Sequence, residues 1–130
     1  MAVWKWLDRA MAGLFLLSAA VQYNDPDPYA WMAVYTAAAA VCLVPVTSRY
    51  RAGVAWLLAS VACFAALRIA PEALALERVG DLTASMAASR PEVEAAREVL
   101  GLAIVSLWCA GLGTRDLWMR RSTGDATASG

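Results

Sequence analysis

Two groups of polar residues, far apart in the chain, could together bind a ligand. The first is the run Gln22-Tyr23-Asn24-Asp25-Pro26-Asp27-Pro28, with two aromatic residues shortly after it. The second group consists of Glu94, Arg97 and Glu98, about seventy residues further on. Carboxylate and amide oxygens are the ligands that Ca²⁺ and Mg²⁺ prefer. If the fold brings the groups together, the candidate site consists of Gln22, Asn24, Asp25, Asp27, Trp31, Tyr35, Glu94, Arg97 and Glu98.

The first group also suits a purely structural role as a tight turn between two helices. Pro26 forces the residue before it out of the helical region. Asp27 can then cap a helix that has Pro28 at its first position. A helix that begins there places Trp31 and Tyr35 one turn apart on a single face. The turn is therefore a ligand site, or only a well-capped connection.

Glu98 borders an apolar segment, where an unpaired charge is costly. Its nearest candidate partners by depth are Gln22, Arg68 and Arg97. The second group can thus be a polar plug that fixes how helices meet. The chain has no histidine, which excludes histidine-ligated haem, Cys/His zinc sites and Ser–His or Cys–His pairs. Since no nucleophile–base pair or cofactor motif is visible, we expect neither an enzyme nor a cofactor, apart from a divalent cation at the candidate site.

The composition favours a membrane protein. Hydrophobic residues make up 61% of the chain and charged residues 17%, against roughly 45–50% and about 25% in soluble domains. With a mean hydropathy of +0.52, a soluble body of 130 residues would have to enclose more apolar surface than its size allows. The net charge is zero, which gives no sign of a nucleic-acid partner. Each cysteine lies in an apolar run and is expected to be buried and reduced.

Four stretches lack charged residues, at 10–24, 28–48, 52–67 and 99–114. Only the second reaches the about 20 residues that a helix needs to cross about 30 Å of hydrocarbon. The others become long enough if flanking Lys and Arg side chains extend to the interface, where aromatic residues also gather. We therefore predict an all-α integral membrane bundle in a single domain, residues 1–121. Its transmembrane helices are predicted at about 4–24, 28–47, 52–70 and 91–113.

Small residues at helical spacing predict two packing faces, since close backbone approach drives helix association in lipid. The face on the third predicted helix consists of Ala55, Ala59, Ala62 and Ala66. The face on the second consists of Ala33, Ala37 and Ala40.

The distribution of Lys and Arg predicts the orientation. Seven basic residues fall on one predicted side, in short flanks: Lys5, Arg9, Arg49, Arg51, Arg115, Arg120 and Arg121. The other four lie in a long acidic loop. By the positive-inside rule, both termini face the cytoplasm and both acidic loops lie outside, in a plasma (inner) membrane. A competing interpretation treats the first segment as a cleaved signal peptide ending near Ser18-Ala19-Ala20, which would leave three spans.

The long loop and the C-terminus complete the prediction. Pro71 can begin an amphipathic helix over about 72–87 that lies on the outer surface. Ser89 can cap the fourth helix, whose first two turns, Glu92 to Glu98, would project above the membrane. That helix is expected to end near Gly111 or Gly113, and residues 122–130 are expected to form a disordered tail.

The motifs also carry a family resemblance. Gln22-x-Asn24-Asp25-Pro26-Asp27, with Trp31, Val34-Tyr35 and Arg97-Glu98-x-x-Gly101-Leu102, resembles the transmembrane protein 220 family, over about Arg9 to Trp108. Glu94 matches the acidic run before the Arg-Glu pair of that family. Members are small polytopic membrane proteins without an assigned activity, so the resemblance implies an architecture and not a reaction. Family members can continue into a further hydrophobic segment, whereas this chain ends in a short polar tail.

Two functions are therefore expected from the sequence. The first is a structural or accessory membrane subunit that packs against itself or a larger membrane complex. The alternative is an ion- or small-ligand-binding membrane protein or transporter with its site at the outer surface. In both, the lipid bilayer is the surrounding partner and no nucleic acid is involved.

Overall fold

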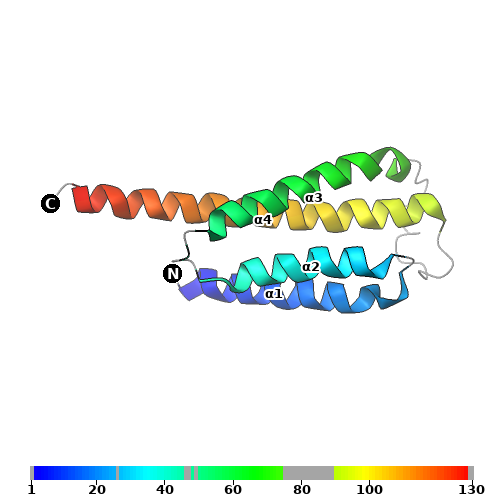
Figure 1. Cartoon of the computed structure of the whole chain (residues 1–130), viewed down its shortest axis with the longest axis horizontal. Coiled ribbons are helices and arrows are strands. Elements are labelled where there is room, and N and C mark those ends of the chain that lie inside the picture. The colour runs from blue at the N-terminus through cyan, green and yellow to red at the C-terminus, as the bar shows by residue number, and fades with distance from the viewer. Residues whose placement is uncertain (1, 26, 46–47, 49, 75–89, 129–130) are drawn as a thin grey trace.

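The computed structural model describes residues 2–25, 27–45, 48, 50–74 and 90–128, with side chains for 3–122 of these. The described residues form helices and contain no strand. The elements are α1 (Ala2–Val21), the 3-10 helix η1 (Gln22–Asn24), α2 (Pro28–Leu43), α3 (Arg51–Ala73) and α4 (Pro91–Ala128). Successive helices run in opposite directions, and both ends of the chain lie at the same end of the bundle (Figure 1). The all-α prediction is confirmed for the described residues, which contain four α-helices.

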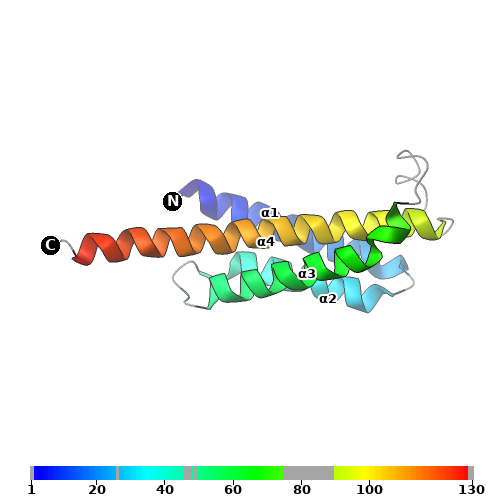
Figure 2. The same cartoon turned by 90° about the horizontal axis from the view of Figure 1, so that it is seen from above.

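The bundle is built from two hairpins. α1 packs closely on α2, and α3 packs more extensively on α4 (Figures 1 and 2). Small side chains predominate in the shared core, and its largest side chains are Phe15, Tyr35, Leu102 and Leu112. Between the hairpins, the Trp108 indole on α4 donates a hydrogen bond of 3.2 Å to the sulfur of Cys42 on α2.

One predicted packing face is correct and the other is wrong. Ala55, Ala59 and Ala62 of α3 are buried in the core, as predicted. Ala33, Ala37 and Ala40 of α2 are instead exposed. The buried face of α2 carries its one large core side chain and its cysteine, with small residues beside them: Tyr35, Ala38, Ala39, Val41 and Cys42. Because α2 is apolar all round, alanine spacing alone does not determine which face packs.

By length and composition, two helices in the described ranges could cross a membrane: α3, and α4 over Pro91–Ser122. α2 is a shorter apolar helix, and α1 carries Lys5, Asp8 and Arg9 within its 20 residues. Large apolar side chains are exposed along the bundle, including Phe64, Leu67 and Leu107. Exposure of this kind is costly in water and normal in lipid.

Two predicted helix boundaries are wrong because a proline acts differently from the expectation. α2 ends at Leu43 and not near residue 47, since Pro45 holds the preceding Val44 in an extended conformation. Pro71 does not begin a new helix but lies inside the last turn of α3. There its missing N–H removes a single hydrogen bond near a helix end. The rest of the predicted surface helix, 75–87, lies outside the described residues.

α4 begins at Pro91 as predicted but differs from the prediction at its other end. Val93, Ala95 and Ala96 in its first turns are buried in the bundle, while the position of these turns above a membrane stays a prediction. At its other end the helix does not stop at Gly111 or Gly113 but continues to Ala128, so 122–128 have a helical backbone where a disordered tail was expected. This end extends well past the other helices (Figures 1 and 2).

Gly113 permits close packing and does not end a helix. A Cβ at this position would lie 2.7 Å from the Trp56 ring and 3.2 Å from the Ala52 carbonyl oxygen on α3. Glycine thus allows the backbones of α3 and α4 to approach each other. No described glycine has the positive φ that favours it at a helix C-terminus.

Replacing Gly113 with alanine is expected to lower the free energy of unfolding by about 1 kcal/mol, because the added methyl group must displace Trp56 or the α3 backbone. Unfolding of the purified chain in mixed SDS–detergent micelles measures this. The matched control is Gly111→Ala, two residues away on the same helix, where an added Cβ meets open space. Equal stability of the two variants would contradict the assigned role of Gly113.

Candidate functional site

The structure brings the central residues of the two predicted polar groups together at one end of the bundle. The side chains of Trp31 on α2 and Glu98 on α4 lie close to each other, and the indole N–H is a donor suited to the carboxylate. One turn further into the bundle, Tyr35 is buried and its hydroxyl lies against the backbone of Gly101. The ring of Tyr35 also stacks on Phe15 of α1, with centroids 6.4 Å apart and planes at 25°. We call Phe15, Trp31, Tyr35, Glu98 and Gly101 the outer cluster, after the predicted outer side of the membrane, and together they join α1, α2 and α4.

Four other predicted residues differ in burial and in their distance from this contact. Asp25 and Glu94 are half-buried and close enough to act electrostatically on Glu98. Asn24 and Asp27 are exposed. Asp27 precedes α2, with Pro28 at its start as predicted, but its side chain makes no capping hydrogen bond. The cap expected there is therefore wrong.

The amide of Gln22 and the partner of Glu98 also differ from expectation. The side-chain oxygen of Gln22 is buried and has no hydrogen-bond partner among the described residues. The neighbour of Glu98 in the structure is Trp31, which is not among the expected partners. An indole N–H can donate to a carboxylate oxygen without adding a charge.

The outer cluster has few groups suited to a metal ion. In the part of the chain that the structure describes, no three acidic or cysteine side chains lie close enough together to hold one. The geometry favours contacts that fix helices over a cation cage, because the Trp31–Glu98 contact, the stacked rings and the close approach of Tyr35 to Gly101 all connect different helices.

A second polar cluster, which the sequence did not predict, lies at the opposite end of the bundle, where the chain termini are (Figure 1). It consists of Asp8 on α1, Arg51 at the start of α3, and Arg115 and Asp116 on α4. Asp8, Arg51 and Asp116 are all less than 5% exposed. We call these four residues the inner ion cluster.

Asp8 is the shared acceptor of the inner ion cluster. Its Oδ2 accepts from the Nη2 atoms of Arg51, at 2.6 Å, and Arg115, at 2.8 Å. Its Oδ1 accepts from Nη1 of Arg115 at 3.0 Å. Arg115 thus binds both oxygens of Asp8, the paired geometry that makes an Arg–carboxylate contact strong.

Asp116 completes the charge balance. It lies 3.5 Å from Nε of Arg51 and 3.4 Å from Nη2 of Arg115. The same Nε also donates to the backbone carbonyl of Val41 on α2, at 3.2 Å. Two arginines and two aspartates cancel, so the cluster is buried without a net charge, and all four α-helices contribute a contact. Mutual pairing of this kind is what makes buried charge tolerable.

A sequence signal for the inner ion cluster was present but weak. Asp8 is the one acidic residue in α1 and occupies the same helical face as Trp4. Asp116 follows Arg115 at the end of an apolar run. The expected position of the basic residues at segment ends is the membrane interface, whereas Arg51 is directed into the bundle.

Comparison with known proteins supports the sequence resemblance. The family model described as transmembrane family 220, helix, matches residues 14–113. This range contains the 3-10 turn, Trp31, Tyr35, Glu98 and Gly101 of the outer cluster, and Arg51 of the inner ion cluster. No solved structure matches the chain.

Proposed function

Because the chain belongs to transmembrane family 220, we propose that it is a structural or accessory membrane protein without enzymatic activity. The observation that supports the proposal is that the buried polar groups of the chain connect its helices. The inner ion cluster and the outer cluster join different helices and occupy the two ends of one bundle. Such contacts fix helix positions, which is the requirement for a rigid body that packs against other membrane helices.

The proposed topology has four membrane spans with both termini cytoplasmic. α1 carries three charged residues among its 20, Lys5, Asp8 and Arg9, and ion pairs to Arg51 and Arg115 compensate Asp8. Paired charges are far less costly in a membrane than isolated ones. Lys5 and Arg9 are exposed near one end of α1 and can extend to the interface. α2 is short, with 16 residues, and local thinning or its flanks can accommodate the difference at modest cost.

Cysteine labelling tests this topology. In a background with Cys42→Ala, Cys63→Ala and Cys109→Ala, single cysteines replace Asn24 and Ser48, which lie at opposite ends of α2. A membrane-impermeant maleimide applied to intact cells is expected to label Asn24→Cys, and to label Ser48→Cys only after permeabilisation. Labelling of both positions from the same side would reject four spans.

The accessory role is tested by the size of the native particle. The protein extracted from its native membrane is expected to migrate as a larger species than the purified recombinant chain in the same detergent. The recombinant chain added to extracts of cells lacking the protein controls for unspecific aggregation. Equal size of the native and recombinant species would contradict a role as a subunit of a larger assembly.

The alternative, a cation- or ligand-binding role at the outer surface, has less support. Asp25, Glu94 and Glu98 interact electrostatically, but the described residues do not form a group of three metal-binding side chains. Stabilisation of the purified chain by Ca²⁺ or Mg²⁺, lost in Asp25→Asn with Glu98→Gln, would favour this alternative over a purely structural cluster.

A further inference from the structure

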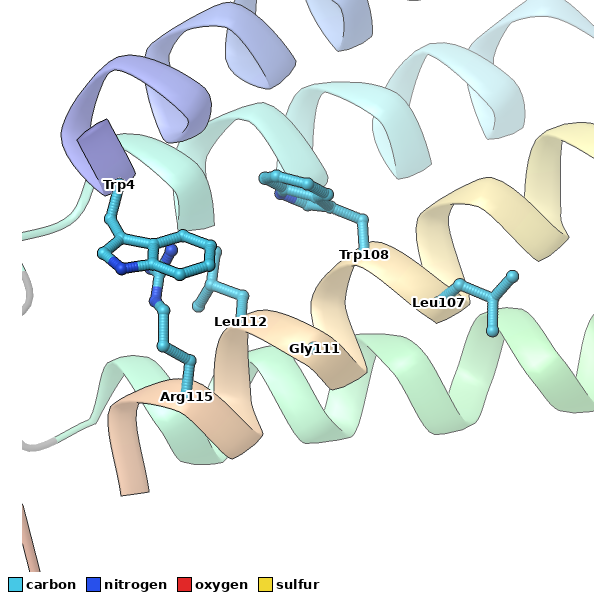
Figure 3. Close-up of a pocket in the computed structure, with 6 residues that line it drawn as sticks. All are labelled: Trp4, Leu107, Trp108, Gly111, Leu112 and Arg115. Carbon is cyan, nitrogen blue, oxygen red and sulfur yellow. The ribbon is translucent and has the colours of Figure 1, made fainter. Parts of the chain in front are cut away.

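A groove between α1 and α4 lies beside the inner ion cluster. It has a volume of about 230 Å³ and is lined by Trp4, Leu107, Trp108, Gly111, Leu112 and Arg115. Figure 3 shows Trp4 over Arg115 at one end, Trp108 and Leu107 at the other, and Gly111 and Leu112 between them. A pocket that encloses a whole small ligand usually measures about 300 Å³ or more. This groove therefore suits one segment of a larger, flexible molecule.

The groove has a polar end and an apolar length. Arg115 lies at the polar end, where Asp8 binds its guanidinium and the Trp4 ring covers it at 5.2 Å. From there the groove follows α4 for two turns, to Leu107, along the charge-free part of the helix. Leu107 is 76% exposed and Trp4 48% exposed, so the groove opens sideways toward the surroundings of the bundle. In the proposed topology these surroundings are lipid chains.

The exposed charged side chains described near the polar end of the groove are all basic. Lys5, Arg9 and Arg121 are exposed, whereas the described acidic side chains at this end, Asp8 and Asp116, are buried in ion pairs. The exposed charged side chains described at this end are therefore basic, and Lys5 is next in sequence to Trp4 of the groove, even though the inner ion cluster itself is neutral. A basic rim attracts anionic head groups, at about 1 kcal/mol for each Lys or Arg near the membrane surface.

We propose that this groove binds an anionic phospholipid. One acyl chain lies between Trp4 and Trp108 over Gly111, and the phosphate contacts the basic rim at Lys5 and Arg9. The Arg115 guanidinium is already hydrogen-bonded to Asp8. The exposed basic residues therefore attract the phosphate, which lies at the level of Arg115 along the bundle. The inference rests on the proposed membrane topology, in which this end of the bundle lies at the cytoplasmic interface.

Gly111 provides the sharpest test. A Cβ there meets nothing within 4 Å, so Gly111→Leu fills the groove without a clash in the core. The matched control is Gly53→Leu on α3, where a Cβ also meets open space. A third variant, Lys5→Gln with Arg9→Gln, removes two exposed charges and leaves the groove unchanged.

Native mass spectrometry of the full chain, purified in micelles with equal amounts of phosphatidylglycerol and phosphatidylcholine, counts the bound lipids. We expect the wild-type chain and Gly53→Leu to retain phosphatidylglycerol at least about fivefold over phosphatidylcholine, as an attraction of about 1 kcal/mol gives. Gly111→Leu is expected to lose bound lipid of both kinds. The Lys5→Gln, Arg9→Gln variant is expected to bind as much lipid in total without the preference.

Equal retention of both lipids by the wild-type chain would overturn the proposal. So would equal lipid binding by Gly111→Leu and Gly53→Leu. If Gly111→Leu fails to fold, the charge variant still decides: an unchanged lipid preference contradicts the basic rim. These outcomes do not depend on cysteine labelling in cells, so a failed lipid site and a failed topology are distinguishable.

Discussion

Replacing Asp8 with asparagine is expected to lower the free energy of unfolding by about 3–5 kcal/mol, the usual cost of removing one partner from a buried ion pair. Asp8 accepts three hydrogen bonds from Arg51 and Arg115. Without its charge, Asp116 is the sole carboxylate left in the cluster for two buried guanidinium groups. Unfolding in mixed SDS–detergent micelles, followed by Trp fluorescence, measures the change.

Two further variants separate charge pairing from a general effect of the substitution. Asp27→Asn removes an exposed acid and is expected to change stability by less than about 0.5 kcal/mol. In Asp8→Asn with Arg115→Gln, one positive and one negative charge are removed together, so the loss should be smaller than the sum of the two single losses. Strict additivity, or an Asp8→Asn effect no larger than that of Asp27→Asn, would show that the pairing does not stabilise the bundle.

The helices were predictable from the sequence where local signals agree. Pro28 located the start of α2, the charge-free run from residue 52 the start of α3, and Ser89 with Pro91 the start of α4. The ends were less predictable, because a single residue type serves opposite purposes. Gly113 carries the same signal as a helix C-cap, yet it permits contact with Ala52 and Trp56. A packing role depends on a neighbour that is distant in sequence, which local patterns do not reveal.

The two polar clusters show the same limit. The outer cluster was predicted because its residues surround a Pro-rich turn and an Arg-Glu pair, which are distinctive strings. Asp8 and Asp116 lack any such string, and their significance comes from burial beside Arg51. Basic residues at segment ends normally extend to the interface. The buried acids, and not the arginines, are therefore the informative signal for an ion cluster inside a membrane bundle.

Replacing Gly101 with alanine is expected to lower the free energy of unfolding by about 1–3 kcal/mol, the usual cost of overpacking a core. The added Cβ would overlap the Tyr35 hydroxyl oxygen and lie 3.3 Å from the ring carbon that bears it. Tyr35 is 8% exposed and stacked on Phe15, so its ring has less room to move than the half-exposed Trp56 beside Gly113. The loss should therefore exceed that of Gly113→Ala, measured in the same micelles.

The double variant Gly101→Ala with Tyr35→Phe tests the assigned contact itself. Phenylalanine keeps the ring and its stacking on Phe15 but removes the oxygen that the new methyl group would meet. We therefore expect the double variant to recover part of the stability lost in Gly101→Ala, and recovery to stay incomplete because the ring carbon remains at 3.3 Å. Gly111→Ala, with open space at its Cβ, is the helix control. If the double variant is less stable than Gly101→Ala, Tyr35 and Gly101 do not meet, and the outer cluster does not join α2 to α4 as assigned.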